Sequence, residues 1–428
     1  MTASAKLGHM TWVRLAGFRS NMLNVILRAT TLASKFLLLV YLARVLPPEQ
    51  LGVYGIFTAT VSYALYLLGL DFYAYAQREM LDKPREAWGG VIRDQFIFYG
   101  LAYLGILPLL LLVVFASGSL PWSLLGWFFL ILSLEHLSQE LYRLLVITQK
   151  HALAGWVLFL RTGAWVYLSL ALIWAVPDLQ NLASVWMGWV FGAGASVAVA
   201  LYGLREFRIG SQKEQPIHWA WMKKGVLVGM KFLLGTLALR GMFTFDRYIL
   251  DWTWGKEQVG VYTFYMGIAS AALSFIDAGI IMQVYPKIMH AIQSHDVQAY
   301  HKAMKELSLG MVLIGTAILI AVWLFIGPVI NFVGHPAYQS SIGTLWALLA
   351  AILAYCFALI PHYPLYARRY DRVILGANLV GFLVFSLAAI WFVKAFSGFG
   401  VALAMFLGMV SIGVVKSAVL LRCPVEHK

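Results

Sequence analysis

The residues with the clearest potential for chemistry are basic side chains in the middle of apolar segments. Arg28 and Lys35 are seven residues apart, so a helix would present them on one face, two turns from each other. Arg240 and Arg247 repeat this spacing in a later apolar segment. A charge at the centre of a membrane costs roughly 2.5 to 3.5 kcal/mol, so it needs a partner, water or a ligand. Because arginine and lysine both bind phosphate, these side chains predict a site for an anion such as a diphosphate.

Other charged side chains in the apolar segments have a competing explanation. Lys231 lies toward one end of its segment and Arg161 about a third of the way into another, so snorkelling to the membrane interface is an alternative to ligand binding. Glu135 is explained equally well by a buried ion pair or by a proton or cation relay. We take Glu135 and Asp246 as candidates for ion coupling. Pairing of the cations with these acids and with lipid phosphates is the alternative to a diphosphate site.

The composition excludes a water-soluble fold. Of the 428 residues, 61% are hydrophobic and 12% are charged, whereas a soluble domain carries about 25% charged residues. Cys356 and Cys423 belong to no CxxC or Cys/His cluster, so the sequence predicts no metal and no cofactor. The GxxxxGK[ST], GxSxG and HExxH patterns are absent. Their absence argues against ATP hydrolysis by this chain, and we assign no catalytic residue.

Twelve apolar segments are long enough to cross a bilayer, which takes about 20 residues. They lie near 22–45, 51–75, 95–116, 122–147, 153–175, 182–204, 225–249, 258–283, 308–332, 341–365, 373–393 and 399–421. The connections are short, which leaves no room for a soluble catalytic domain. Of 32 Lys and Arg residues, 21 fall on the side that we assign to the cytoplasm and three on the other side. The positive-inside rule therefore places both termini in the cytoplasm and explains the net charge of +13 without nucleic acid.

A sequence repeat divides the chain into two halves. Residues 49–54 read Glu-Gln-Leu-Gly-Val-Tyr, and residues 257–262, 208 positions later, read Glu-Gln-Val-Gly-Val-Tyr. Each motif opens the second span of a six-span half, so the halves are expected to be related by a pseudo-twofold axis along the membrane normal. The sequence thus predicts an all-α polytopic membrane protein with two six-helix lobes, residues 1–212 and 213–428. A cleft between the lobes would be lined by their cationic first helices.

Three segments carry a resemblance to a known family. Residues 35–54, which read KFLLLVYLARVLPPEQLGVY, resemble the opening of Wzx-type polysaccharide flippases. These flippases belong to the multidrug/oligosaccharidyl-lipid/polysaccharide (MOP) exporter superfamily. Residues 245–250 followed by 257–262, and residues 283–287, resemble later parts of the same family. The resemblance implies a MATE-like fold in which two lobes form a V around a cation-lined cavity that opens alternately to the two sides of the membrane.

The resemblance also implies the substrate, an undecaprenyl diphosphate carrying an O-antigen-type oligosaccharide. The substrate would be turned from the cytoplasmic to the periplasmic leaflet of the bacterial inner membrane for lipopolysaccharide or similar polymer assembly. Membrane lipids and this substrate are the implied partners, with a polysaccharide polymerase and a chain-length protein as candidates and a monomer as the expected state. The positions that we match to the cavity are Arg28, Lys35, Arg240 and Arg247, and with a looser match Arg161 and Lys231.

Two alternatives to a flippase follow from the same sequence. A drug/cation antiporter of the same superfamily needs acids in its cavity, whereas bases outnumber deep acids in these spans. A membrane polysaccharide polymerase or glycosyltransferase generally carries its catalytic residues on a large outer loop, and the outer loops here are short. We therefore favour a transporter over an enzyme.

Overall fold

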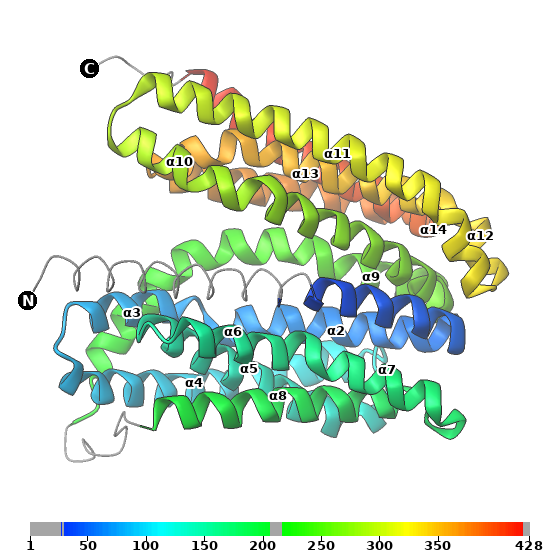
Figure 1. Ribbon diagram of the computed structural model, residues 1–428, viewed down its shortest axis with the longest axis horizontal. Coiled ribbons are helices and arrows are strands. Elements are labelled where there is room, and N and C mark those ends of the chain that lie inside the picture. The colour runs from blue at the N-terminus through cyan, green and yellow to red at the C-terminus, as the bar shows by residue number, and fades with distance from the viewer. Residues whose placement is uncertain (1–26, 28–29, 206–215, 423–428) are drawn as a thin grey trace, which may run out of the picture. The chain divides into compact units, whose positions relative to one another are not determined.

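The described part of the chain is built from helices alone. The computed structural model describes residues 27, 30–205 and 216–422, and no strand occurs among them (Figure 1). A helix at residues 30–45 comes first. The helices that follow are α2 (Pro48–Gly69), α3 (Phe72–Leu81), α4 (Trp88–Leu110), α5 (Leu125–Ile147), α6 (His151–Phe159), α7 (Trp165–Ala175), α8 (Leu182–Leu204), α9 (Trp219–Ile276), α10 (Met282–Gln293), α11 (Val297–Val333), α12 (Pro336–Ser340), α13 (Ile342–Ala367) and α14 (Asp371–Arg422). The predicted all-α fold class is confirmed.

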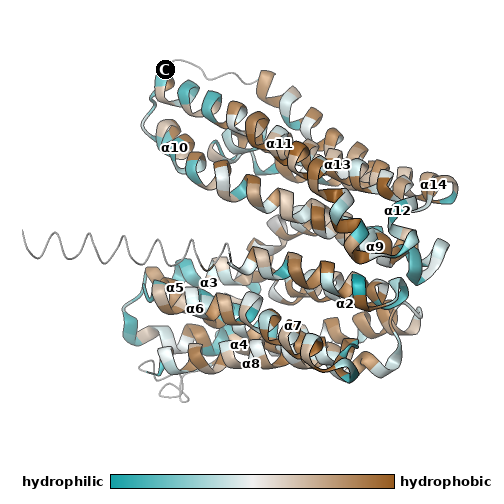
Figure 2. Ribbon diagram, turned by 45° about the vertical axis from the view of Figure 1, so that its right-hand side comes forward, coloured by the Kyte–Doolittle hydropathy of each residue, from teal (hydrophilic) through white to brown (hydrophobic). Residues whose placement is uncertain are grey.

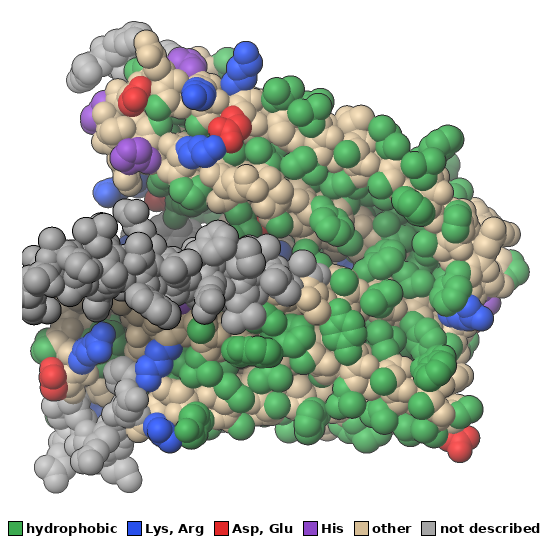
Figure 3. Space-filling view, viewed as in Figure 1, with side chains coloured by type: hydrophobic (Ala, Val, Ile, Leu, Met, Phe, Trp, Pro, Cys, Tyr) green, Lys and Arg blue, Asp and Glu red, His purple; other side chains and the backbone are tan. Residues whose placement is uncertain are grey.

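The helices are suited to a lipid environment. Among the described residues, eight helical segments are long and apolar enough to cross a membrane. Only 17% of the most apolar window of α11 is buried inside the protein, so most of its side chains require lipid as their surroundings. Apolar residues cover the middles of the helices, and charged side chains gather toward the helix ends (Figures 2 and 3). The chain is therefore a multi-pass membrane protein, while the count of twelve spans and the side of the termini stay predictions.

Two long helices each contain one break. Gly255 in α9 has φ 78° and ψ −177°, and Ser397 in α14 has φ 50° and ψ −131°. Without its break, the 58-residue α9 would be about 87 Å long, nearly three times the hydrocarbon thickness of about 30 Å. Glycine adopts a positive φ without steric cost, and the Ser397 hydroxyl donates a hydrogen bond to Gln258 Oε1 at 3.2 Å. Each break falls between two predicted spans and separates segments of membrane-spanning length.

Helix boundaries agree with the sequence prediction except at local interruptions. The helices α5, α8 and α13 begin and end within three residues of the predicted spans. The predicted span 51–75 instead contains a break at Leu70 and Asp71, which both have positive φ, so α3 is a separate helix. The segment 284–307, predicted as a connection, is helical in α10 and in the beginning of α11.

Contacts between residues divide the chain into two compact units. The first holds the described residues of Met1–Leu38, Tyr73–Leu101 and Ser123–Met222, and the second holds those of Leu39–Phe72, Ala102–Trp122 and Lys223–Lys428. Within the first unit α5 packs against α6 and α8, and within the second α13 packs against α14 (Figure 1). The lobe boundary at residues 212 and 213 stays a prediction.

The two copies of the repeat motif meet within the second unit. A Cβ atom built on Gly52 would lie 3.1 Å from Gly260 N and closer than 3.0 Å to Lys256 O. Conversely, a Cβ on Gly260 would lie 3.1 Å from Gly52 N and closer than 3.0 Å to Pro48 O. Because Pro48 and Lys256 are also 208 residues apart, the contact is reciprocal. The helices approach this closely because both positions are glycine. Within the second unit, the contact joins α2 to α9.

Candidate functional site

In the first unit the structure brings Glu135 and Arg161 together. Glu135 lies in the middle of α5 and is only 7% exposed. Arg161 lies in a π-helical turn, Leu160–Ala164, between α6 and α7. Its Nε is 3.7 Å from Glu135 Oε2, which is within ion-pair distance but too long for a hydrogen bond. Arg161 Nε and Nη1 are buried and have no hydrogen-bond partner among the described residues.

A tryptophan pair and a second cation complete this cluster. Trp189 Nε1 donates a hydrogen bond to Glu135 Oε1 at 2.6 Å. The Trp189 ring stacks on Trp165 with a centroid distance of 5.7 Å and an interplanar angle of 3°. Lys35 interacts electrostatically with both Glu135 and Arg161. Arg161 is within ion-pair distance of the carboxylate and Lys35 lies further from it, so two basic side chains surround one acid, and this local excess of cations can bind an anion.

One turn further along α5, a separate polar network contains Glu140. This carboxylate is 2% exposed and accepts hydrogen bonds from Gln95 Nε2 at 2.9 Å and from the Tyr99 hydroxyl at 2.8 Å. Arg143 also pairs with Glu140, as its spacing of three residues predicts, and its guanidinium lies over the ring of Tyr73 at 3.4 Å. Because every partner belongs to the protein, the network holds helices together. No sequence pattern identifies Gln95 and Tyr99 of α4 as partners of Glu140.

In the second unit, the adjacent residues Asp246 and Arg247 form a buried pair. Asp246 has no exposed surface and accepts a hydrogen bond from the Tyr262 hydroxyl at 2.9 Å. Arg247 Nη1 lies 3.1 Å from Asp246 Oδ1 and donates to the Phe243 carbonyl at 2.7 Å. The charge of Arg247 is thereby neutralised within the chain. This geometry favours a structural pair that anchors Tyr262, a residue of the second repeat motif, and the binding role of Arg247 stays a prediction.

Arg240, two turns before Arg247 on α9, has a different environment. Its side chain is exposed, and its guanidinium carbon lies 5.2 Å from the centre of the Tyr66 ring. It forms no ion pair with any described carboxylate. Tyr355 also interacts electrostatically with Arg240. Of the described cations predicted for α9, Arg240 is the one that keeps an uncompensated charge.

Two of the six predicted cationic positions have no described side chain. Arg28 lies outside the described residues. Lys231 lies within α9, but its side chain is not among those described. Their binding roles stay predictions.

The environment of Lys416 on α14 differs from the one that the sequence predicts. Its place near the end of its span predicts snorkelling to the interface, but the side chain is buried, with 3% exposure. It interacts electrostatically with His362 of α13, the helix against which α14 packs. The sequence Pro361-His362-Tyr363-Pro364 lies in the last two turns of α13, which ends at Ala367, in agreement with its prediction as a helix end.

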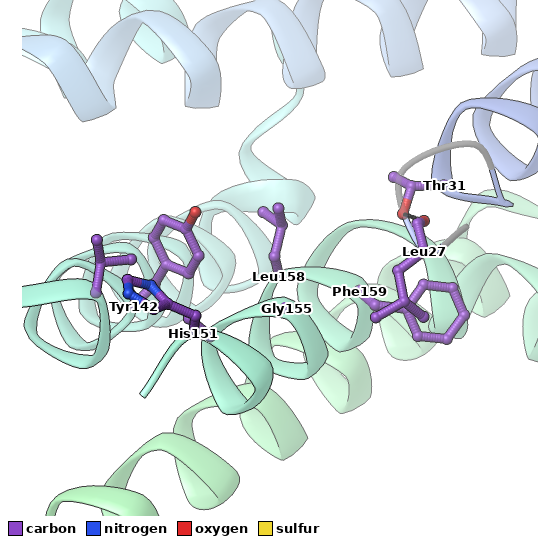
Figure 4. A pocket seen from close by; sticks show the side chains of 9 residues that line it. Leu27, Thr31, Tyr142, His151, Gly155, Leu158 and Phe159 are labelled. Atoms are coloured by element: carbon purple, nitrogen blue, oxygen red, sulfur yellow. Dashed lines mark hydrogen bonds between the residues drawn. The ribbon is translucent and has the colours of Figure 1, made fainter. Parts of the chain in front are cut away.

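The first unit contains a small cavity (Figure 4). It encloses about 180 Å³, and its lining includes Leu27, Thr31, Tyr142, His151 and Phe159. None of the predicted cationic residues with a described side chain lines it. No group of three His, Cys, Asp or Glu side chains in the described ranges is arranged to hold a metal ion.

Comparison with known proteins gives matches to one family and to a fold. Residues 22–292, more than half of the chain, match the model of a family described as "Polysaccharide biosynthesis protein". No curated protein sequence matches the chain.

Two solved structures share the architecture. An inward-facing multidrug resistance MATE family transporter of the MOP superfamily is 15% identical, with a TM-score of 0.68 over 91% of this chain and 96% of that chain. An outward-facing MATE family transporter of the same superfamily is 13% identical, with a TM-score of 0.57 over 92% and 93%. At such identities the likeness establishes the fold, and the predicted MATE-like fold is confirmed.

Proposed function

Because the chain belongs to the family of polysaccharide biosynthesis proteins, we propose that it is a flippase for an oligosaccharide linked to undecaprenyl diphosphate. The observation that carries this proposal is the excess of cations over carboxylates in apolar helices. Arg161 pairs with Glu135, whereas Lys35, which lies near both, and Arg240 have no ion-pair partner among the described residues. Cations retained at such cost are explained by an anion that they bind, and the diphosphate is the anionic part of such a substrate.

Each part of the substrate has its own solvent requirement. The diphosphate binds guanidinium and ammonium groups, which replace its water. The oligosaccharide needs an aqueous passage, while the prenyl chain remains in lipid. Movement from the cytoplasmic to the periplasmic leaflet of a bacterial inner membrane then requires the passage to open alternately to the two sides, as the predicted pair of six-helix lobes allows.

Ion coupling is the part of the proposal that concerns Glu135 and Asp246. Each carboxylate has an arginine partner, so a proton or cation that binds there must compete with that arginine. Purified protein in liposomes would be given the lipid-linked saccharide under an imposed proton or sodium gradient. If the transport rate is the same under every gradient, ion coupling is refuted and the flippase proposal stands.

Surface polysaccharide is the direct test of the flippase. We expect Arg240→Ala and Arg161→Ala, introduced singly into a strain that depends on this protein, to reduce surface polymer and to raise the lipid-linked precursor in the cytoplasmic leaflet. Lys287→Ala is the matched control, because Lys287 forms an exposed ion pair with Glu306 at 2.6 Å. Protein levels would be measured in each strain. Full surface polymer from both variants at normal protein levels would refute the cationic site.

The antiporter and the enzyme are each distinguished from the flippase by a separate observation. A drug/cation antiporter needs an available acid, yet both candidate acids pair with arginine. A polysaccharide polymerase or glycosyltransferase would form new glycosidic bonds when purified protein is incubated with lipid-linked saccharide. We expect no such product. Its appearance would show that the protein is an enzyme and would refute the flippase proposal.

A further inference from the structure

Four partly exposed tyrosines lie in the second unit, and two of them, Tyr66 and Tyr355, neighbour Arg240. They come from α2, α10 and α13, and α10 packs against α13. We call this set the tyrosine face, and its members are Tyr66, Tyr285, Tyr355 and Tyr363.

One ring contact and the neighbourhood of Tyr355 connect the members of the tyrosine face. The rings of Tyr285 and Tyr363 have centroids 5.2 Å apart. Tyr363 and Tyr66 each lie in the neighbourhood of Tyr355. Tyr355 is therefore the central member, and it also meets Phe243 of α9 edge to face at 6.2 Å.

Two opposite charges flank the tyrosine face. Arg240 lies over Tyr66 and also interacts with Tyr355. Asp277, which is exposed, interacts with Tyr355 and Tyr363. Asp277 begins a π-helical turn, Asp277–Ile281, and such turns occur frequently at functional sites. A cation and a carboxylate therefore both lie near the aromatic rings of the face.

The tyrosine hydroxyls call for a partner outside the protein. None of the four donates or accepts a hydrogen bond among the described residues. A hydroxyl within the hydrocarbon requires water or a ligand, because lipid tails offer no hydrogen bond. An aromatic belt does not account for Tyr355, since 13 residues separate it from Ile342, which places it about 20 Å along α13.

We propose that the tyrosine face binds the sugar next to the diphosphate and selects for it. This inference rests on the proposed function. Arg240 binds a diphosphate oxygen, Asp277 accepts hydrogen bonds from sugar hydroxyls, and the Tyr355 hydroxyl donates a hydrogen bond to a sugar oxygen. A few directed polar groups on an aromatic surface are the usual composition of a selective ligand site.

The test compares a lipid with and without its sugar. Full-length protein in lipid nanodiscs would be titrated with undecaprenyl diphosphate and with undecaprenyl diphosphate N-acetylglucosamine, and binding would be followed by native mass spectrometry. We expect the glycosylated lipid to bind about tenfold more tightly, the factor that one or two neutral hydrogen bonds provide. Tyr355→Ala and Asp277→Asn should reduce the ratio to within about twofold, while the affinity for the bare lipid is kept. Arg240→Ala should weaken both lipids.

Two further variants control for folding and for position. Tyr355→Phe removes only the hydroxyl, so it keeps the core intact if Tyr355→Ala does not fold, and it should lower the ratio about threefold. Phe357→Ala is the matched control, because Phe357 is 42% exposed on the opposite side of α13 and should keep the full ratio.

Each other outcome has a defined meaning. Equal affinity of the wild-type chain for the two lipids, or a ratio that survives Tyr355→Phe and Asp277→Asn, overturns the sugar site and leaves the flippase standing. Failure of the wild-type chain to bind either lipid overturns the proposed function and, with it, this inference.

Discussion

Replacing Gly260 by alanine is expected to force α2 and the second half of α9 apart. The new Cβ would lie closer than 3.0 Å to Pro48 O, whereas a carbon and a carbonyl oxygen normally stay about 3.3 Å or more apart. The obstacle is backbone on a packed helix, so no side-chain rotation relieves it. Overpacking of this kind costs about 1 to 3 kcal/mol, and we expect the upper part of that range.

A second glycine provides the matched control for this substitution. An added Cβ at Gly376 in α14 meets nothing within 4 Å. Gly376→Ala should therefore stabilise the protein by about 0.4 to 1 kcal/mol, because alanine loses less conformational freedom on folding. The midpoint of thermal unfolding in one detergent would be compared for both variants. Midpoints that shift equally, or a Gly260→Ala midpoint at the wild-type value, would refute the close contact.

A double variant at Gly52 and Gly260 tests the contact more sharply, because the contact is reciprocal. Gly52→Ala meets Lys256 O across the same crossing, so the separation forced by one alanine also makes room for the other. The double variant should lose less stability than the sum of the single variants. Strict additivity would mean that the two glycines do not share one contact.

Three predictions concern buried charges, and each is measured by the thermal unfolding midpoint. Glu140→Ala leaves the partly buried Arg143 and the buried Gln95 and Tyr99 without their shared acceptor and should cost about 3 to 5 kcal/mol, so an unchanged midpoint would contradict the network. Glu135→Gln should lower the midpoint, and adding Arg161→Met should restore part of the loss; a further fall would show that Arg161 does not depend on Glu135. Lys416→Met should raise the midpoint because an apolar chain of similar length replaces a desolvated ammonium group, and a fall would argue against this.

Much of the fold could be predicted because a bilayer imposes strict rules on sequence. Apolar length identified α8 to the residue, and the repeat of Glu-Gln-x-Gly-Val-Tyr identified two helices that the structure brings into contact. The break at Leu70 and Asp71 escaped prediction, since neither residue is a glycine or a proline. The buried place of Lys416 also escaped, because hydropathy does not say which face of a helix packs on its neighbour.

The partners of the candidate residues were beyond sequence reasoning for a related reason. Trp189 lies 54 residues from Glu135, and no local spacing connects them. Arg161 reaches the same carboxylate from a π-helical turn, which alters the direction that a regular helix would give its side chain. Local patterns identified the costly charges, while packing between distant helices decided which of them are neutralised.

The crossing of Gly52 and Gly260 also bears on how a chain of two halves can arise. Each glycine faces a carbonyl oxygen of the other copy, and a carbonyl is present whatever the side chain, which is why proline at 48 and lysine at 256 serve equally well. Two identical half-length chains would satisfy this contact with a single glycine per chain, as in any isologous dimer. Gene fusion would then preserve the interface without a new mutation. The two halves would afterwards be free to diverge everywhere except at that shared point.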